Sequence, residues 1–217
     1  MKTALLVGCG SKFGLRMLKE LLDNNWVIYS IAGSEILPHE NLHQLIVNWS
    51  TCNQATIEKF LNGLPELDLV FFNQNSTSLT DTSFKSLSKL DALKLEKHWV
   101  QSYFISCILP YHIIQNTKLS ASTKVIWMLS SYIYFHAEIR YADYLGDKFQ
   151  NYIIMKNFSQ TERACFMGIN PGNLDNEINL KNILNLLEKP SLELNGKVMY
   201  VDGIEDKNFD KFTNKSI

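Results

Sequence analysis

The start of the chain holds the pattern that most constrains the fold. An apolar run, Thr3–Val7, leads into the turn Gly8-Cys9-Gly10-Ser11-Lys12-Phe13-Gly14, and apolar residues then recur at helical spacing as far as Asn24. A buried strand that passes through a glycine turn into an amphipathic helix is typical of the first unit of a doubly wound α/β sheet. This pattern predicts that a parallel sheet forms the centre of the fold.

The same alternation of strand and helix signals continues to the end of the chain, and no repeat or linker interrupts it. We expect an α/β fold: one domain over residues 1–217, a doubly wound parallel sheet of about seven strands with helices on both faces. The other predicted strands are Trp26–Ile31, Leu45–Asn48, Leu67–Phe72, Lys124–Leu129, Ala164–Ile169 and Lys197–Val201. The predicted helices are Gly14–Asn24, Gln54–Asn62, about Leu90–Gln115, about Tyr141–Thr161 and about Glu177–Leu187.

Composition excludes several classes of partner. A net charge of −1 provides no basic surface for nucleic acid or for an acidic membrane. No apolar stretch approaches the ~18 residues that cross a bilayer. The first apolar run ends at Gly8, where a helical pattern follows instead of a cleavage site, so we expect a cytoplasmic protein. Four distant cysteines (Cys9, Cys52, Cys107 and Cys165) favour reduced thiols over a disulfide framework or a metal site.

The glycine turn is suited to binding a phosphate. Glycine lets a ligand approach the backbone and permits positive φ, while the following helix N-terminus offers N–H groups and a positive dipole end. We expect this turn to hold the pyrophosphate of a dinucleotide. The alternative is a glycine turn without a ligand, because the spacing differs from G-x-G-x-x-G. The expected binding residues in the turn are Gly8, Gly10, Ser11, Lys12, Phe13 and Gly14.

The end of the second strand bears on the choice of dinucleotide. NAD-binding domains of this class usually place a carboxylate there to hold the ribose hydroxyls. Here Gly33 takes that place, and Ser34 with Lys12 can bind a 2′-phosphate. Glu35 is close enough to weaken the argument. NADP is therefore favoured over NAD.

From about Lys2 to Gly203 the chain resembles the short-chain dehydrogenase/reductase family. In the family motif T-G-x-x-x-G-x-G, Gly8 and Gly14 match the first and last glycines, while Lys12 replaces the middle one. Three further motifs match in part and in the right order: Asn48-Trp49, Phe72-Asn73-Gln74-Asn75 and Ile169-Asn170-Pro171-Gly172. The resemblance implies a Rossmann fold that binds NAD(P). It implies further cofactor contacts from Asn48, Asn73, Pro171, Gly172 and Asn176.

Carbonyl reduction needs a proton donor, and a tyrosine serves near neutral pH only if a nearby ammonium lowers its pKa. Residues four apart share one helix face, and the chain contains two such pairs, Tyr144 with Lys148 and Tyr152 with Lys156. In the resembled family a serine lies about a dozen residues before the tyrosine. Ser131 lies 13 residues before Tyr144 but 21 before Tyr152, so we choose the first pair.

By resemblance, Tyr144 is the general acid, and Lys148 lowers its pKa and binds the nicotinamide ribose. Ser131, rather than Ser130, holds the substrate oxygen, and Gln101 replaces the family's relay asparagine. We expect an oxidoreductase that acts on a small molecule in a minimal pocket, with no metal. The alternative is a dinucleotide-binding protein with a regulatory or scaffold role and little turnover. The resemblance also implies a homodimer or homotetramer, for which the apolar stretch Phe104–Ile114 offers a surface.

Overall fold

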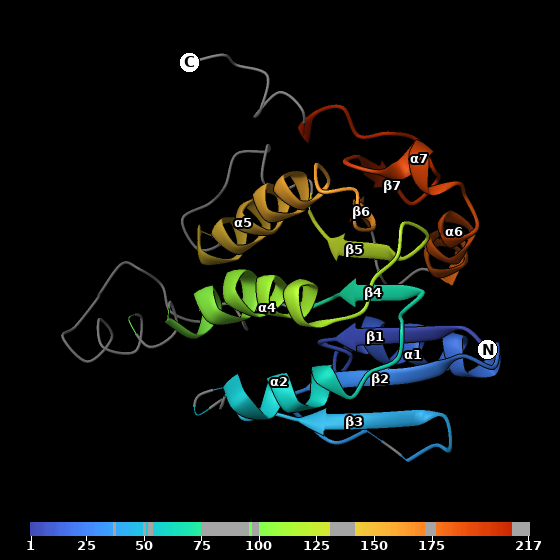
Figure 1. The fold of residues 1–217 in the computed structure, drawn as a ribbon. Helices are drawn as coiled ribbons and strands as arrows, with labels where there is room; N and C mark the ends of the chain where they lie inside the picture. Colours follow the sequence, from blue (N-terminus) through green and yellow to red (C-terminus); the bar gives the residue numbers. More distant parts are fainter. Residues whose placement is uncertain are drawn as a thin grey trace.

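A seven-stranded parallel sheet forms the centre of the computed structural model (Figure 1). The structure describes residues 1–36, 38–49, 51, 54–74, 96, 100–130, 142–171 and 177–209, with backbone only for 142–143 and 177–179. The strand order is β3-β2-β1-β4-β5-β6-β7, so the chain winds outward from β1 in both directions. The strands are β1 Thr3–Val7, β2 Val27–Ala32, β3 Leu42–Ile46, β4 Leu69–Phe72, β5 Lys124–Met128, β6 Cys165–Asn170 and β7 Val198–Tyr200.

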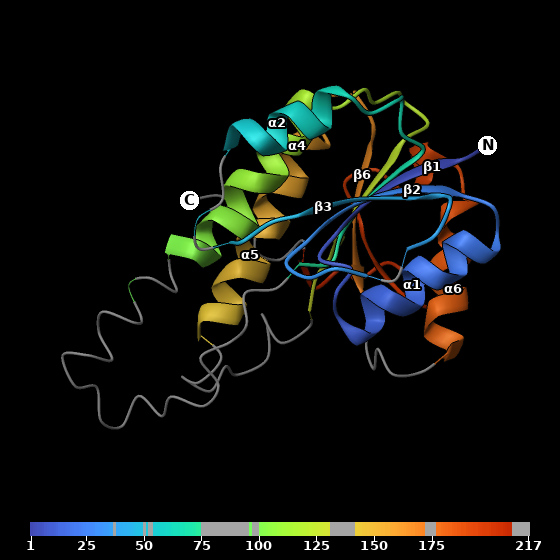
Figure 2. The same ribbon diagram turned by 90° about the horizontal axis from the view of Figure 1, so that it is seen from below.

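Helices cover both faces of the sheet (Figure 2). On one face lie α1 (Lys12–Asp23) and α6 (Glu177–Leu187), and on the other lie α2 (Gln54–Asn62), α4 (Leu109–Asn116) and α5 (Ala142–Phe158). A short π-helix, η2 (Phe104–Ile108), continues directly into α4. The short helix α7 (Ser191–Leu194) precedes the last strand.

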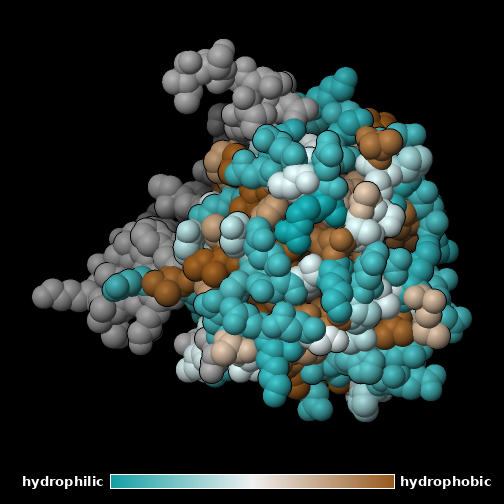
Figure 3. All heavy atoms as spheres, in the orientation of Figure 1, coloured by the Kyte–Doolittle hydropathy of each residue, from teal (hydrophilic) through white to brown (hydrophobic). Residues whose placement is uncertain are grey.

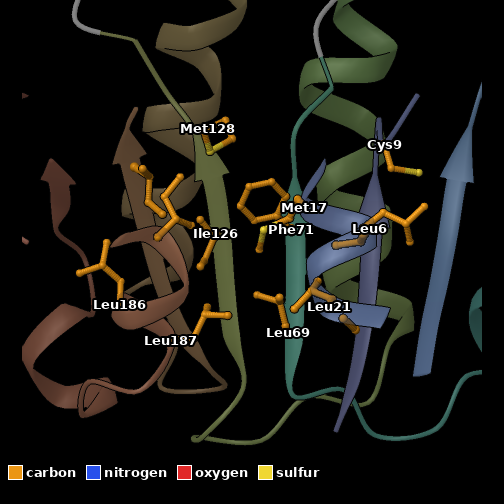
Figure 4. Close-up of a cluster of buried hydrophobic side chains, with 14 of the residues drawn as sticks. Leu6, Cys9, Met17, Leu21, Leu69, Phe71, Ile126, Met128, Leu186 and Leu187 are labelled. Atoms are coloured by element: carbon orange, nitrogen blue, oxygen red, sulfur yellow. The ribbon is translucent and has the colours of Figure 1, made fainter. Parts of the chain in front are cut away.

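The inner strands are mainly apolar because both faces of a parallel sheet are covered. Every residue of β4 and β6 is buried. Two apolar clusters result, one on each face of the sheet. Figure 4 shows part of the first, in which Met17 and Leu21 of α1 lie near Leu69 and Phe71 of β4.

The sequence predicted the fold class and the seven strands correctly, and six strands agree with their predicted bounds to within two residues. The third strand was placed wrongly, at Leu45–Asn48 instead of Leu42–Ile46. As a partly exposed edge strand it contains the polar residues His43 and Gln44, so the apolar run covered only its end. The prediction of one helix over about Leu90–Gln115 also missed the π-helix before α4.

Within the part of the chain that the structure describes, no helix has the length and apolar character needed to cross a membrane. Of the four cysteines the structure describes Cys9, Cys107 and Cys165, and all three are free thiols.

Candidate active site

The turn between β1 and α1 lies at the carboxyl edge of the sheet, where ligands of doubly wound folds bind. Gly8 has a φ of 79°, and a Cβ added there would lie 2.6 Å from the backbone of Gln74 at the end of β4. A Cβ on Gly14 would lie 2.6 Å from the Cα of Cys9. Both glycines are therefore required by the packing of the turn itself, with or without a ligand.

Asn73 fixes this turn to the end of β4. Its amide nitrogen donates to the carbonyl oxygen of Gly8 at 3.1 Å and to the hydroxyl of Ser11 at 2.9 Å. The Ser11 oxygen also accepts the amide N–H of Gly14 at 3.0 Å and so caps α1. The turn is thus rigid, and Gly10, Ser11 and Lys12 are exposed on its outer side.

Phe13 differs from the other residues of the turn. Its side chain is buried in the core, with its ring centroid 6.4 Å from that of Phe71. Only the backbone of Phe13 can therefore contribute to phosphate binding.

The end of β2 lies next to the glycine turn. A Cβ on Gly10 would lie 3.1 Å from the hydroxyl oxygen of Ser34, and one on Gly33 would lie 2.8 Å from the indole Nε1 of Trp49. Gly33, Ser34 and Asn48 are exposed. A hydroxyl and an indole N–H thus occupy the place where a carboxylate would hold an NAD ribose. These donors lie close to the N-terminus of α1, and such a group of donors suits the phosphates of a dinucleotide.

Tyr144 and Lys148 come together in the first turns of α5. The Lys148 ammonium lies 5.6 Å from the centroid of the Tyr144 ring and donates to the carbonyl oxygen of Met128, at the end of β5, at 2.6 Å. Only 2% of the Lys148 surface is exposed. Burial lowers the Lys148 pKa to about 8, although the negative charge of Asp147 acts in the opposite direction.

The second tyrosine–lysine pair is used within the fold. Tyr152 is fully buried, and its hydroxyl donates to the carbonyl oxygen of Phe209 at 2.9 Å. Lys156 donates to the carbonyl oxygen of Gly196 at 2.9 Å. These bonds connect α5 to the C-terminal segment and to the turn before β7.

The other predicted site residues lie, in the sequence, before η2 and after β5 and β6. Ser131, Gly172 and Asn176 lie outside the described residues. Gln101 is half-buried in the helical turn before η2, and Pro171 is buried directly after β6. Ser130 is buried after the end of β5.

A group of buried polar side chains that includes the residue directly before Lys148 was not identified from the sequence. The carboxylate of Asp147 accepts hydrogen bonds from the hydroxyls of Ser102 at 2.5 Å and Ser106 at 3.1 Å. Gln74 donates to the carbonyl oxygen of Ile105 at 3.2 Å. Two serines four residues apart in an otherwise apolar helix, and a carboxylate directly before Lys148, were the available signals.

No family model matches this chain, and no curated protein matches it either. Solved structures match over almost the whole chain. A short-chain dehydrogenase family protein from Francisella tularensis has a TM-score of 0.70 at 13% identity, covering 92% of this chain and 96% of that one. A short-chain dehydrogenase/reductase from Serratia marcescens has a TM-score of 0.68 at 12% identity, covering 92% and 94%.

A third structure, from Burkholderia multivorans, is named after the same family and was solved with bound NADP. It has a TM-score of 0.68 at 16% identity and covers 94% of this chain and 98% of its own. Identities this low establish the architecture alone. The chain therefore has the Rossmann-type fold of the short-chain dehydrogenases/reductases.

Proposed function

We propose that this protein is an NAD(P)-dependent oxidoreductase that reduces a carbonyl, or oxidises an alcohol, of a small molecule. The observation that carries the proposal is the pairing of Tyr144 with Lys148 in the first turns of α5, beside the carboxyl end of β5. A phenol and an ammonium one helical turn apart are the groups that proton transfer to a carbonyl oxygen requires.

The cofactor would bind along the carboxyl edge of the sheet. The turn from Gly8 to Gly14 would hold its pyrophosphate, and Asn48 and Asn73 would border the adenosine half. Pro171, with Gly172 and Asn176, would border the nicotinamide. The donors of Ser34 and Trp49 beside Gly33 support NADP over NAD, and a structural neighbour with bound NADP is consistent with this choice.

The cofactor, when bound, supplies or accepts the hydride. In the reducing direction Tyr144 donates its phenolic proton to the carbonyl oxygen of the substrate. The Lys148 ammonium stabilises the phenolate that remains, because an adjacent positive charge lowers the phenol pKa. Ser131 would hold the substrate oxygen, and Gln101 would take part in returning a proton.

The second candidate is a dinucleotide-binding protein with little or no turnover. It is favoured by one observation: Lys148 is almost completely buried, and its ammonium is already bonded to Met128. The departures from the family pattern at Lys12, Asn75 and Gln101 agree with it. Dinucleotide affinity without activity on a broad panel of aldehydes and ketones would favour this candidate.

The test compares the two tyrosines. The fluorescence of NADPH and NADH would be titrated with the protein, and reductase activity would then be measured on the carbonyl panel. We expect Tyr144→Phe to lower kcat by roughly 10²-fold or more while NADPH still binds. Tyr152→Phe is the matched control and should keep its activity. Full activity in Tyr144→Phe, or loss confined to Tyr152→Phe, would contradict the assignment.

We also propose a homo-oligomer built on α4 and α5, as the resemblance implies. The cytoplasmic location and the small-molecule nature of the substrate remain predictions from composition and fold.

A further inference from the structure

A buried carboxylate lies directly before the proposed catalytic lysine. Asp147 is 7% exposed and sits on α5, beside Lys148 in the sequence. Carboxylates are rarely buried unless a partner compensates for the lost hydration. Here the Ser102 hydroxyl donates to the carboxylate at 2.5 Å, and the Ser106 hydroxyl lies 3.1 Å from the same oxygen. A buried carboxylate with two hydroxyls against one of its oxygens, in the residue directly before Lys148, indicates a role beyond packing.

The two serines come from the segment where the helix widens. The Ser106 hydroxyl lies 2.6 Å from the carbonyl oxygen of Ser102, one turn earlier, as well as near Asp147. A serine that bonds this carbonyl competes with the backbone ladder and distorts the helix. The π-helix η2 contains Ser106, and single π-turns are frequent at functional sites. The distortion thus accompanies contact between both serines and α5.

Gln74 connects η2 to the other side of the site. Its side-chain amide donates to the carbonyl oxygen of Ile105, inside the π-helix. The preceding residue, Asn73, holds the glycine turn. Separate polar contacts, joined through neighbouring residues of the chain, therefore connect the proposed phosphate turn to the end of β4, Gln74 to η2 and Ser106 to Asp147, and the next residue, Lys148, bonds to β5.

We propose that Asp147, held by Ser102 and Ser106, is a positioning residue for the Tyr144–Lys148 pair. It fixes the rotation of α5 against η2, and its negative charge acts on the ammonium of the next residue, Lys148. The catalytic consequence of this inference rests on the proposed function. The charge interaction between Asp147 and Lys148 does not.

The pKa of the Lys148 ammonium depends on the charged and polar groups around it. On α5 these are the carboxylate of Asp147 and the phenol of Tyr144. From β5 the Met128 carbonyl oxygen accepts its hydrogen bond, and η2 contributes the neutral hydroxyls that hold Asp147. Burial lowers the Lys148 pKa, and the Asp147 charge raises it. Removing that charge while keeping the shape should therefore lower the Lys148 pKa further.

The decisive variant is Asp147→Asn, assayed for NADPH-dependent reduction from pH 6 to 10. The alkaline limb of the kcat profile should move to lower pH by about one unit, because the ammonium loses its opposite charge. Asp23→Asn, at the exposed end of α1, is the control and should leave the limb in place. An unmoved limb in Asp147→Asn would overturn the charge role.

The serines test the positioning role separately. In Ser102→Ala/Ser106→Ala the charge remains, but these two hydroxyls are lost. We expect kcat to fall roughly tenfold to a hundredfold, since small displacements of reacting groups are costly. The dissociation constant for NADPH should change less than about twofold, because this pair lies away from the phosphate turn. A wild-type kcat in this variant would overturn the positioning role, even if Asp147→Asn failed to fold.

A cofactor-free measurement separates this proposal from the proposed function. Urea unfolding of Asp147→Asn, Lys148→Met and the double variant forms a cycle for the pair. The coupling should change the unfolding equilibrium constant about tenfold at pH 7 and should nearly vanish at pH 10, where Lys148 is neutral. If the cycle showed no coupling at pH 7, the interaction between Asp147 and Lys148 would be refuted. If the wild type bound no dinucleotide, the proposed function would fail, and this cycle alone would decide the charge interaction.

Discussion

Lys148 is costly for folding, and the proposed function gives it a chemical use. Its pKa is lowered from 10.5 to about 8 by burial, so the unfolded chain binds this proton more tightly than the folded protein does. A lysine whose pKa is lower in the folded state than in the unfolded state destabilises the fold below about pH 8. The free energy of unfolding then increases as the pH rises towards 10.5.

The first prediction follows from this increase in stability with pH. Between pH 7 and 10.5 the wild type should gain up to about 3 kcal/mol of unfolding free energy relative to Lys148→Met. Urea unfolding at both pH values measures the difference, and Lys19→Met controls for an exposed lysine whose charge is not buried. Parallel pH curves for the wild type and Lys148→Met would show that Lys148 is not buried as a charge.

Gly8 and Gly146 provide the second prediction as a matched pair. Gly8→Ala should destabilise the protein by about 2–4 kcal/mol, because it adds a Cβ at positive φ against the backbone of Gln74. Gly146 lies in α5 with nothing within 4 Å of an added Cβ, so Gly146→Ala should stabilise by about 0.5–1 kcal/mol. Thermal unfolding compares them, and equal effects would contradict the packing of the turn.

The sequence alone explains the roles of Gly8, Gly14 and Asp147 only in part. Gly8 and Gly14 were selected for phosphate approach, yet the structure shows that they also remove clashes between the turn, β4 and α1. That second reason depends on which backbone lies opposite, which a single sequence does not contain. Asp147 could not be recognised as buried for the same reason, since its donors come from a segment about 40 residues earlier.

At the level of elements, the strength of the apolar pattern decided what could be predicted. The almost fully buried strand β1 and the amphipathic helix α2 were predicted with their observed bounds. The edge strand β3 was misplaced because its polar residues hide it from a search for apolar runs. The π-helix η2 was missed because one widened turn leaves the helical pattern on either side almost unchanged.

The docking of the C-terminal segment on α5 gives the third prediction. Tyr152→Phe removes the hydroxyl that donates to Phe209 and leaves that carbonyl oxygen buried without this donor. We expect a loss of about 1–2 kcal/mol in unfolding free energy. Tyr111→Phe, on the exposed side of α4, should change it by less than about 0.5 kcal/mol. Chemical denaturation of both variants tests this, and equal stabilities would show that the segment is not held by this bond.

For the whole molecule, the alternation of elements predicted a parallel sheet, but it did not determine which strands are neighbours. The order β3-β2-β1-β4 requires the chain to return from β3 to the other side of β1. This crossover places the ends of β1 and β4 side by side, which lets Asn73 reach the glycine turn. The site is therefore a consequence of topology, and its individual contacts could be identified only from the folded chain.

The last prediction concerns assembly. Apolar side chains at helical spacing form an exposed stripe along the turn before η2, η2 itself and α4, although the inner side of α4 is already buried in the core. On the face seen in Figure 3, hydrophobic side chains gather near the start of this helix. A helix that is apolar on both sides is expected to be covered by a partner. The exposed stripe consists of Val100, Tyr103, Ile108 and Tyr111.

We therefore expect a homo-oligomer in sedimentation velocity at micromolar concentration, and Tyr111→Glu should shift it to monomer. A carboxylate placed in a desolvated interface should weaken association roughly a hundredfold or more. Leu192→Glu, at an equally apolar but 95% exposed position on α7, is the matched control and should leave the assembly intact. Only a contact centred on the stripe makes Tyr111 the sensitive position. A wild type that sediments as a monomer would therefore exclude α4 as the interface, and so would equal dissociation of both variants.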